Sequence, residues 1–328
     1  MALIGLDSQI AAFRDAAQSD RLHHAWLLAG PEGVGKASFA ALAATWLLAD
    51  AAGPRVYLPG LETPEDHPIA NFVRQGSHPD LRVLTRLTRE KTDDLARSIS
   101  IDQVRGLQSL FSTTPSFSPR RVVIIDAIDD LERPAANALL KNLEEPPSGT
   151  TFFLISHAAG RLLPTIRSRC RLLRFGRLPT SAMTSVLQRE LPEEPMDEIA
   201  ALTRVGEGAP GRAMRFAGLD IAALDKAIDR LVGEGDPTNA LRSALAKQLG
   251  TKAVQARYEA FLERAPARIA AEAKTRTGAS LRSAIDLWEE ARKVGESAVH
   301  LSMDQQTTVF ELATMLARLA PATGGAKA

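Results

Sequence analysis

The first half of the chain alternates short apolar runs with longer amphipathic segments. Three of the runs have the length and composition of buried strands, at residues 25–29, 122–125 and 152–155, and residues 81–84 look like a further short strand. Apolar positions recur at helical spacing before and between them, within residues 1–20 and over residues 36–49, 102–111 and 134–145. Strands that alternate with helices predict an α/β core with a mostly parallel sheet, covered by helices on both faces.

The pattern changes after Phe175, where strand-like runs end and helical spacing takes over. Residues 178–218 are expected to form short helices, and residues 220–320 are expected to be helical almost throughout. These changes predict three domains: an α/β nucleotide-binding-like domain over residues 1–177, a small helical lid domain over residues 178–219, and a C-terminal all-helical domain over residues 220–328.

Two stretches of the first half are predicted to be loops. Residues 50–80 contain five prolines, which interrupt regular structure. Residues 86–98 are polar and charged and are expected to form an exposed loop, to which we assign no role.

Composition narrows the classes of protein that fit. The 328 residues carry a formal net charge of +1, without the basic excess that binders of duplex DNA usually show. Cys170 is the one cysteine, which excludes a disulfide framework and a cysteine-rich zinc site. The histidines lack metal-binding spacing, so we expect no metal. Without a signal-peptide pattern or an apolar run long enough to cross a membrane, a cytoplasmic location is expected.

A glycine-rich turn joins the first predicted strand to the helix that follows it. Residues 30–37 read GPEGVGKA, which fits a phosphate loop through Lys36. Gly30, Gly33 and Gly35 would let backbone N–H groups surround phosphate oxygens, and Lys36 would reach the terminal phosphates. Ala37 stands where the magnesium-binding hydroxyl belongs, so we predict the shape of a phosphate loop without its magnesium site. A glycine-rich turn with a chance lysine is the structural alternative.

The strand at residues 122–125 is followed by an acid, as a Walker B strand is. Asp126 comes directly after the run and is followed by Ala127. Hydrolysis would need a glutamate at position 127 to activate water, and capping explains the next acids, Asp129 and Asp130. Asp126 is therefore a candidate degenerate Walker B acid, with an ordinary polar strand end as the alternative. Together, Ala37 and Ala127 remove both magnesium binding and water activation.

Two longer blocks are more specific than the phosphate loop. Residues 137–147 read NALLKNLEEPP and residues 163–170 read LPTIRSRC, and both strongly resemble bacterial clamp-loader subunits, as does HAWLL at residues 24–28. With its degenerate nucleotide site, the chain resembles the delta-prime family of the DNA polymerase III clamp loader over residues 1–215. This resemblance implies an AAA+ phosphate-loop core, a small helical lid domain, and a C-terminal helical oligomerisation domain that joins a ring-shaped collar.

The resemblance assigns roles to two arginines. Arg169 lies in a Ser-Arg-Cys sequence that matches the family motif whose arginine is offered to ATP bound by the neighbouring subunit. Such an arginine finger neutralises charge that develops on the γ-phosphate. Arg212, in the PGRA sequence of residues 210–213, is similar to the family's sensor 2 arginine and would brace the lid. The alternative for Arg169 is a basic surface cluster shared with other arginines: Arg161, Arg167, Arg171 and Arg174.

The function implied by the resemblance is that of a non-hydrolysing, stator-like subunit. Its partners would be the gamma/tau and delta subunits, and through the assembly it would act on the sliding clamp and primed DNA. No cofactor is required, although binding of ATP or ADP without hydrolysis is left open. The isolated chain is not expected to catalyse a reaction, although the holoenzyme is a DNA-directed DNA polymerase, a nucleotidyltransferase. Residues 50–80 lack the four-cysteine zinc module that many family members carry, so no zinc is expected.

Two other functions are weighed against this one. An ATP-hydrolysing motor subunit of the gamma/tau type is opposed by Ala37 and Ala127. A DNA-binding protein that acts alone is opposed by the near-neutral charge and by the lack of an aromatic and basic stripe. Neither reading involves a membrane.

Overall fold

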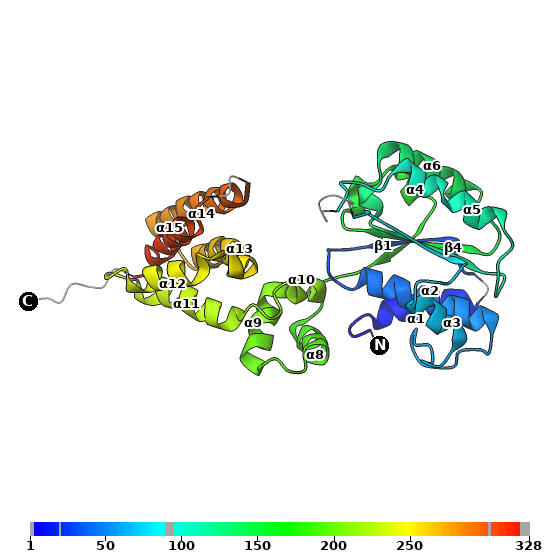
Figure 1. Ribbon diagram of the computed structural model, residues 1–328, viewed down its shortest axis with the longest axis horizontal. Helices are drawn as coiled ribbons and strands as arrows, with labels where there is room; N and C mark the ends of the chain where they lie inside the picture. The colour runs from blue at the N-terminus through cyan, green and yellow to red at the C-terminus, as the bar shows by residue number, and fades with distance from the viewer. Residues whose placement is uncertain (1–2, 20, 89–94, 301–302, 322–328) are drawn as a thin grey trace, which may run out of the picture. The chain divides into compact units, whose positions relative to one another are not determined.

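The computed structural model describes residues 3–19, 21–88, 95–300 and 303–321 (Figure 1). Contacts within the chain divide it into two units, which we call the α/β unit and the helical unit. The α/β unit comprises Met1–Glu190 and Gly206–Ala213, and the helical unit comprises Leu191–Val205 and Met214–Ala328. The segment predicted to be a lid domain is thus shared between the units, and the three-domain division stays a prediction. Part of the charged segment 86–98 lies outside the described residues.

A parallel sheet forms the centre of the α/β unit. Its strands are β1 Ala25–Ala29, β2 Leu81–Thr85, β3 Arg121–Asp126, β4 Thr150–Ser156 and β5 Arg171–Arg174. They lie in the order β2-β3-β4-β1-β5, and all neighbouring pairs are parallel. The predicted α/β core with a parallel sheet is therefore confirmed. Strand β5 was missed because its sequence, RLLR, is short and largely exposed at the sheet edge.

Helices cover both faces of this sheet, with α1–α3 on one face and α4–α6 on the other (Figure 1). Their bounds are α1 Asp7–Gln18, α2 Lys36–Ala52, α3 Pro68–Arg74, α4 Ile101–Arg105, α5 Leu107–Ser112, α6 Arg133–Glu144, α7 Pro164–Arg167, α8 Thr180–Glu190 and α10 Pro210–Met214, with 3-10 turns η1 Ile128–Asp130 and η2 Ala159–Arg161.

Helix α3 corrects the expectation of a loop over residues 50–80. Pro68 is the first residue of the helix, where the missing N–H of proline costs no hydrogen bond. The ring of His67 caps the helix, because its Nδ1 accepts the N–H of Ile69 at 3.2 Å. Pro68, which in the sequence indicates a loop, therefore marks the beginning of a short helix.

Apolar side chains pack against both faces of the sheet, which explains why its central strands have nearly uninterrupted apolar sequences. On the α1–α2 face, the rings of Phe13 and Trp26 meet edge to face at 5.1 Å, and Phe13 also packs on Phe153. On the α4–α6 face, buried residues from the strands and helices form one cluster that includes Leu27, Val104, Leu107, Leu139, Leu143, Phe152 and Ile166.

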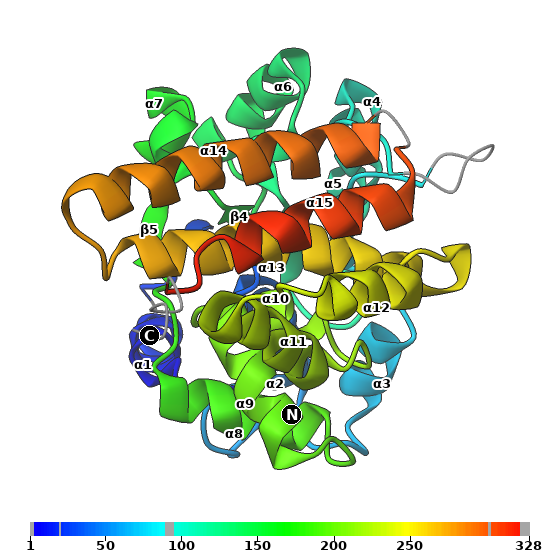
Figure 2. The same ribbon diagram turned by 90° about the vertical axis from the view of Figure 1, so that its left-hand side faces the viewer.

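The helical unit contains the remaining described helices, and the predicted all-helical C-terminal region is confirmed. Their bounds are α9 Met196–Gly206, α11 Ile221–Glu234, α12 Ala240–Leu249, α13 Gln255–Ala273, α14 Gly278–His300 and α15 Gln305–Ala317, with the 3-10 turn η3 Lys252–Val254. Helices α13, α14 and α15 run side by side (Figure 2). Among the described residues, no helix combines the length and the apolar character needed to cross a membrane.

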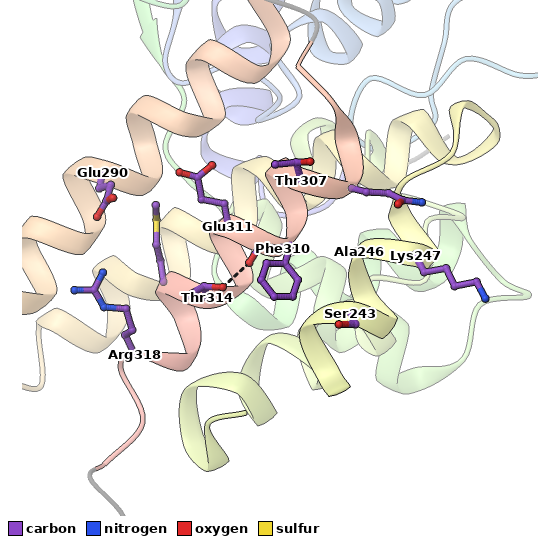
Figure 3. A pocket seen from close by; sticks show the side chains of 11 residues that line it. Ser243, Ala246, Lys247, Glu290, Thr307, Phe310, Glu311, Thr314 and Arg318 are labelled. Atoms are coloured by element: carbon purple, nitrogen blue, oxygen red, sulfur yellow. Dashed lines mark hydrogen bonds between the residues drawn. The ribbon is translucent and has the colours of Figure 1, made fainter. Parts of the chain in front are cut away.

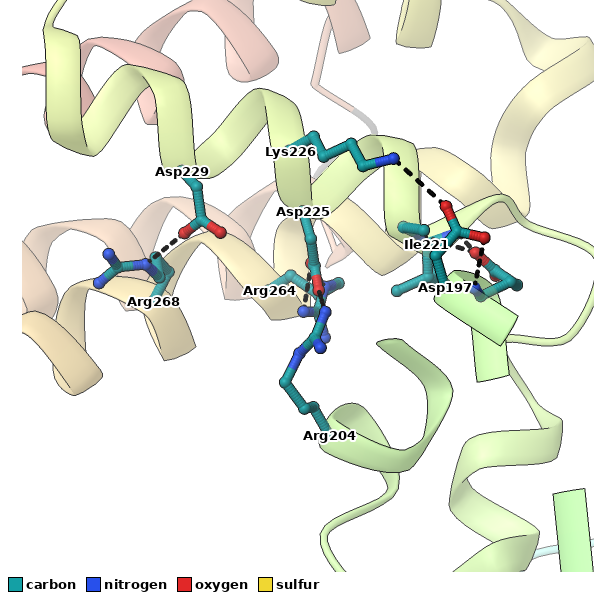
Figure 4. Close-up of polar contacts among 10 residues, drawn as sticks. Asp197, Arg204, Ile221, Asp225, Lys226, Asp229, Arg264 and Arg268 are labelled. Carbon is teal, nitrogen blue, oxygen red and sulfur yellow. Dashed lines mark hydrogen bonds and ion pairs between the residues drawn. The ribbon is translucent and has the colours of Figure 1, made fainter. Parts of the chain in front are cut away.

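Charged side chains fix α9 and α13 to α11 (Figure 4). Glu198, which is 4% exposed, accepts two backbone N–H groups at the beginning of α11, at 2.8 and 2.7 Å. A carboxylate at this position complements both the free N–H groups and the positive end of the helix. Asp225 of α11 pairs with Arg264 of α13 and, at 3.4 Å, with Arg204 of α9. These contacts explain why residues 191–205 belong to the helical unit.

Candidate functional site

The glycine-rich loop lies between the end of β1 and the beginning of α2, as the sequence predicts. Packing and backbone conformation explain why glycine occupies positions 30, 33 and 35 of this loop, without reference to a ligand. A Cβ on Gly30 would lie 2.1 Å from the carbonyl oxygen of Phe175, the residue after β5. Gly33 and Gly35 have φ values of +78° and +97°, which favour glycine strongly. The loop shape therefore follows from packing and backbone conformation within this chain.

Lys36 bonds to the loop that it follows. The residue is 3% exposed, and its Nζ donates to the carbonyl oxygens of Gly30 at 2.7 Å and Pro31 at 2.5 Å. Burial lowers the pKa of Lys36 to about 8, against the opposing effect of Asp126 and other nearby acids. The ammonium group that would reach a phosphate thus has two acceptors of its own in the loop.

The free energy of unfolding of the α/β unit should depend on pH because of this buried lysine. Its folded-state pKa lies below the ordinary value of 10.5, so the unfolded chain binds more protons between pH 8 and pH 10.5. We expect Lys36 to make the free energy of unfolding rise across this window, by about 1–2 kcal/mol. Urea unfolding at several pH values should show a steeper rise in the unchanged protein than in Lys36→Met. Lys141→Met, at an exposed position, is the control; equal slopes in all three proteins would contradict the expectation.

Burial and hydrogen bonds set the surroundings of the acids at and after the end of β3. Asp126 ends the strand, and burial raises the pKa of its carboxyl, with His157 and Lys36 opposing that shift. Ala127 is buried and has no polar group. Asp129, one turn further, accepts hydrogen bonds from Ser156 Oγ at 3.0 Å and from the N–H of His157 at 2.6 Å. It ties η1 to the end of β4, and this role corrects the expectation that Asp129 caps a helix, because no side chain caps η1.

The predicted sensor 2 segment contacts the glycine-rich loop through its backbone. The N–H of Gly211 donates to the carbonyl oxygen of Gly33 at 2.8 Å, and a Cβ on either glycine would come within 3 Å of the other segment. The side chain of Arg212 makes an ion pair with Glu207 at 2.9 Å, and Glu207 also pairs with Arg177 at 3.2 Å. The backbone next to Arg212 is therefore near the loop, while the guanidinium of Arg212 is bound by a carboxylate of the same unit.

Arg169 follows α7 and is held by groups from two elements. Its Nη1 donates to the carbonyl oxygen of Thr165 at 2.9 Å, and its Nη2 lies 2.8 Å from Oε1 of Glu144. The side chain is 34% exposed, so a partner can reach it.

Cys170, next to Arg169, donates its Sγ–H to the carbonyl oxygen of Ile166 at 3.1 Å, and burial raises the pKa of the thiol to about 12. The thiol is thus a packing group, with little tendency to react.

The other arginines of the suggested basic cluster have different surroundings. Arg171 stacks over the ring of Trp26, with its guanidinium carbon 4.8 Å from the ring centroid. Arg167 and Arg174 line a hollow of about 980 Å³ that also includes Gly30, Pro31 and His157. This hollow could not be predicted from the sequence, because its wall includes residues of the unpredicted strand β5. The roles assigned to Arg169 and Arg212 stay predictions.

A second hollow lies within the helical unit, between α12, α14 and α15 (Figure 3). Its volume is about 900 Å³, and Phe310 and Met315 form part of its apolar lining. Charged residues of both signs complete the lining: Lys247, Glu290, Glu311 and Arg318. The hollow depends on how three helices pack, so no local pattern in the sequence marks it.

The family model and the related sequences match this chain to subunits of bacterial DNA polymerase III. A family model described as "DNA polymerase III, delta subunit" matches residues 5–179. The chain is 35% identical to DNA polymerase III subunit delta' of Pseudomonas aeruginosa over 198 residues, covering 60% of this chain and 56% of the relative. It is 36% identical to the Bacillus subtilis subunit of the same name, over 51% of this chain and 46% of the relative. Subunit tau of Escherichia coli is 28% identical over 73% of this chain and 36% of the relative. The matches thus span about half the length of the two delta' relatives.

Proposed function

The chain belongs to the DNA polymerase III delta subunit family, and we propose from this premise that it is a non-hydrolysing subunit of the delta-prime type in a sliding-clamp loader. It would act as a stator-like component and supply Arg169 to ATP bound by a neighbouring motor subunit. The observation that carries the proposal is the pairing of a retained loop with Ala127 at the position of the catalytic acid, where neighbouring Asp129 is bound by the end of β4.

The two cations near the loop are bonded to groups of this chain. Lys36 bonds to the carbonyl oxygens of Gly30 and Pro31, and Arg212 pairs with Glu207. These contacts join both cations to groups of the same unit, and a nucleotide phosphate would compete with them. ATP or ADP could still bind by displacing these contacts, without the residues that hydrolysis needs.

We further propose the partners of the chain on the basis of its family. They are the gamma/tau-type motor subunits and a delta subunit, and the assembly acts on the sliding clamp and on primed DNA. The C-terminal helical domain would join the subunits in a collar. The cytoplasmic location and the absence of zinc stay predictions.

ATP hydrolysis by the purified chain separates this proposal from the alternative of a gamma/tau-type motor. We expect no magnesium-dependent ATPase above that of Lys36→Ala, which serves as the background control. A separate titration with nucleotide then measures binding without hydrolysis. Substantial magnesium-dependent turnover that Lys36→Ala abolishes would reject the proposal in favour of the motor subunit.

A further inference from the structure

Glu144 joins α6 to the proposed finger. It is the last residue of α6, and its Oε1 lies 2.8 Å from Nη2 of Arg169. The carbonyl oxygen of Thr165 accepts from Nη1 of the same guanidinium at 2.9 Å. We propose that Glu144 is a positioning residue, which holds Arg169 in the orientation required by the neighbouring subunit's nucleotide. This inference rests on the proposed function and adds a residue that acts through the finger.

Both groups that hold the guanidinium are fixed to the core. Leu143, next to Glu144, is 1% exposed, and its carbonyl oxygen is bonded by the ring of His24 at 3.1 Å. Ile166, next to Thr165, is also 1% exposed and belongs to the same buried cluster as Leu143. A side chain held from two such anchors loses less conformational freedom when it binds a phosphate.

The geometry leaves the guanidinium able to bind an anion. Glu144 and Thr165 each engage one terminal nitrogen, and a guanidinium has further N–H groups that can be offered to phosphate oxygens. The end of α6 also favours a cation, because helix carbonyl groups give it a partial negative charge. Glu144 can therefore remain bound to Arg169 while the arginine contacts a partner's phosphate.

The exposure of the Arg169–Glu144 pair indicates that it contributes little to the stability of the fold. The side chains of Arg169 and Glu144 are 34% and 49% exposed, and ion pairs exposed to this extent add little to folding stability. Substitutions at Glu144 should therefore leave the chain folded and able to assemble. Their effects on hydrolysis can then be attributed to the position of Arg169.

The test uses the full chain, reconstituted with its partner subunits, clamp and primed DNA. Glu144→Ala should reduce hydrolysis at the adjacent nucleotide site by about tenfold, because the finger is less well placed. Glu144→Gln, whose amide oxygen can accept the same hydrogen bond, should restore most of the rate. Glu145→Ala is the matched control, since it removes the neighbouring exposed carboxylate, which makes no ion pair within the described residues. Glu144→Ala combined with Arg169→Ala should be no slower than Arg169→Ala alone.

The outcomes distinguish this inference from the function on which it rests. If Arg169→Ala itself leaves hydrolysis unchanged, the proposed finger is wrong. If Arg169→Ala slows hydrolysis and Glu144→Ala does not, the finger stands and the positioning role of Glu144 is rejected. Faster hydrolysis with Glu144→Ala also overturns the inference, because the carboxylate would then be competing with phosphate for Arg169.

Discussion

Assemblies that contain Arg169→Ala should hydrolyse ATP about 1,000-fold more slowly at the nucleotide site that faces this chain. A guanidinium near the γ-phosphate neutralises the negative charge that develops during transfer, and alanine supplies no such charge. The variant should still fold and assemble, because the pair between Arg169 and Glu144 is an exposed one, worth about 1 kcal/mol or less. Pre-steady-state hydrolysis by the reconstituted assembly measures the effect. Slow hydrolysis at this one site should lower the amplitude of the first turnover by the share that the site contributes.

Two further variants separate the finger from the general charge of this surface. Arg167→Ala removes an exposed arginine two residues away and should leave the first turnover nearly unchanged. Arg169→Lys keeps the charge without the planar fork and should give an intermediate rate. Equal slowing by Arg167→Ala and Arg169→Ala would point to net charge, and normal hydrolysis with Arg169→Ala would show that the finger assignment is wrong.

Burial dictates the composition of the three predicted strands β1, β3 and β4, whereas β2 was predicted although it lies at the sheet edge and is largely exposed. Strands β1, β3 and β4 are covered on both faces, so their apolar sequences are almost uninterrupted. Strand β5 lies at the edge with exposed arginines, and no apolar run marks it. Helix α3 was missed because a proline is compatible both with a loop and with the first turn of a helix.

The sequence predicted which residues make up the candidate site, but it did not predict the contacts between them. The sequence showed the glycines, Lys36 and the loss of an acid at Ala127. It could not show that Lys36 bonds to its own loop, or that Glu144 holds Arg169, because side-chain partners depend on the packed structure. The close approach of Gly33 to Gly211 joins segments that are far apart in the sequence. Such contacts leave no local pattern beyond the glycines themselves.

Gly30→Ala should destabilise the α/β unit by about 3 kcal/mol or more in the absence of any nucleotide. An added Cβ would lie 2.1 Å from the carbonyl oxygen of Phe175, and that atom belongs to the backbone. The backbone is fixed there, because the N–H of Phe175 donates to Ala29 at 2.7 Å and its ring packs on Phe39. Relief of the clash therefore requires β1 and the segment after β5 to move apart.

Gly176→Ala is the matched control for this prediction, because it lies beside Phe175 and an added Cβ there would meet no atom within 4 Å. It should be neutral or slightly stabilising, by less than about 1 kcal/mol. Urea unfolding followed by tryptophan fluorescence in a Trp288→Phe background reports on the α/β unit, since Trp26 and Trp46 both lie there. Equal stability of the two alanine variants would contradict the packing explanation for Gly30. A large difference would mean that packing within the chain is enough to explain the first glycine of the loop, so that this glycine is not evidence for a bound nucleotide.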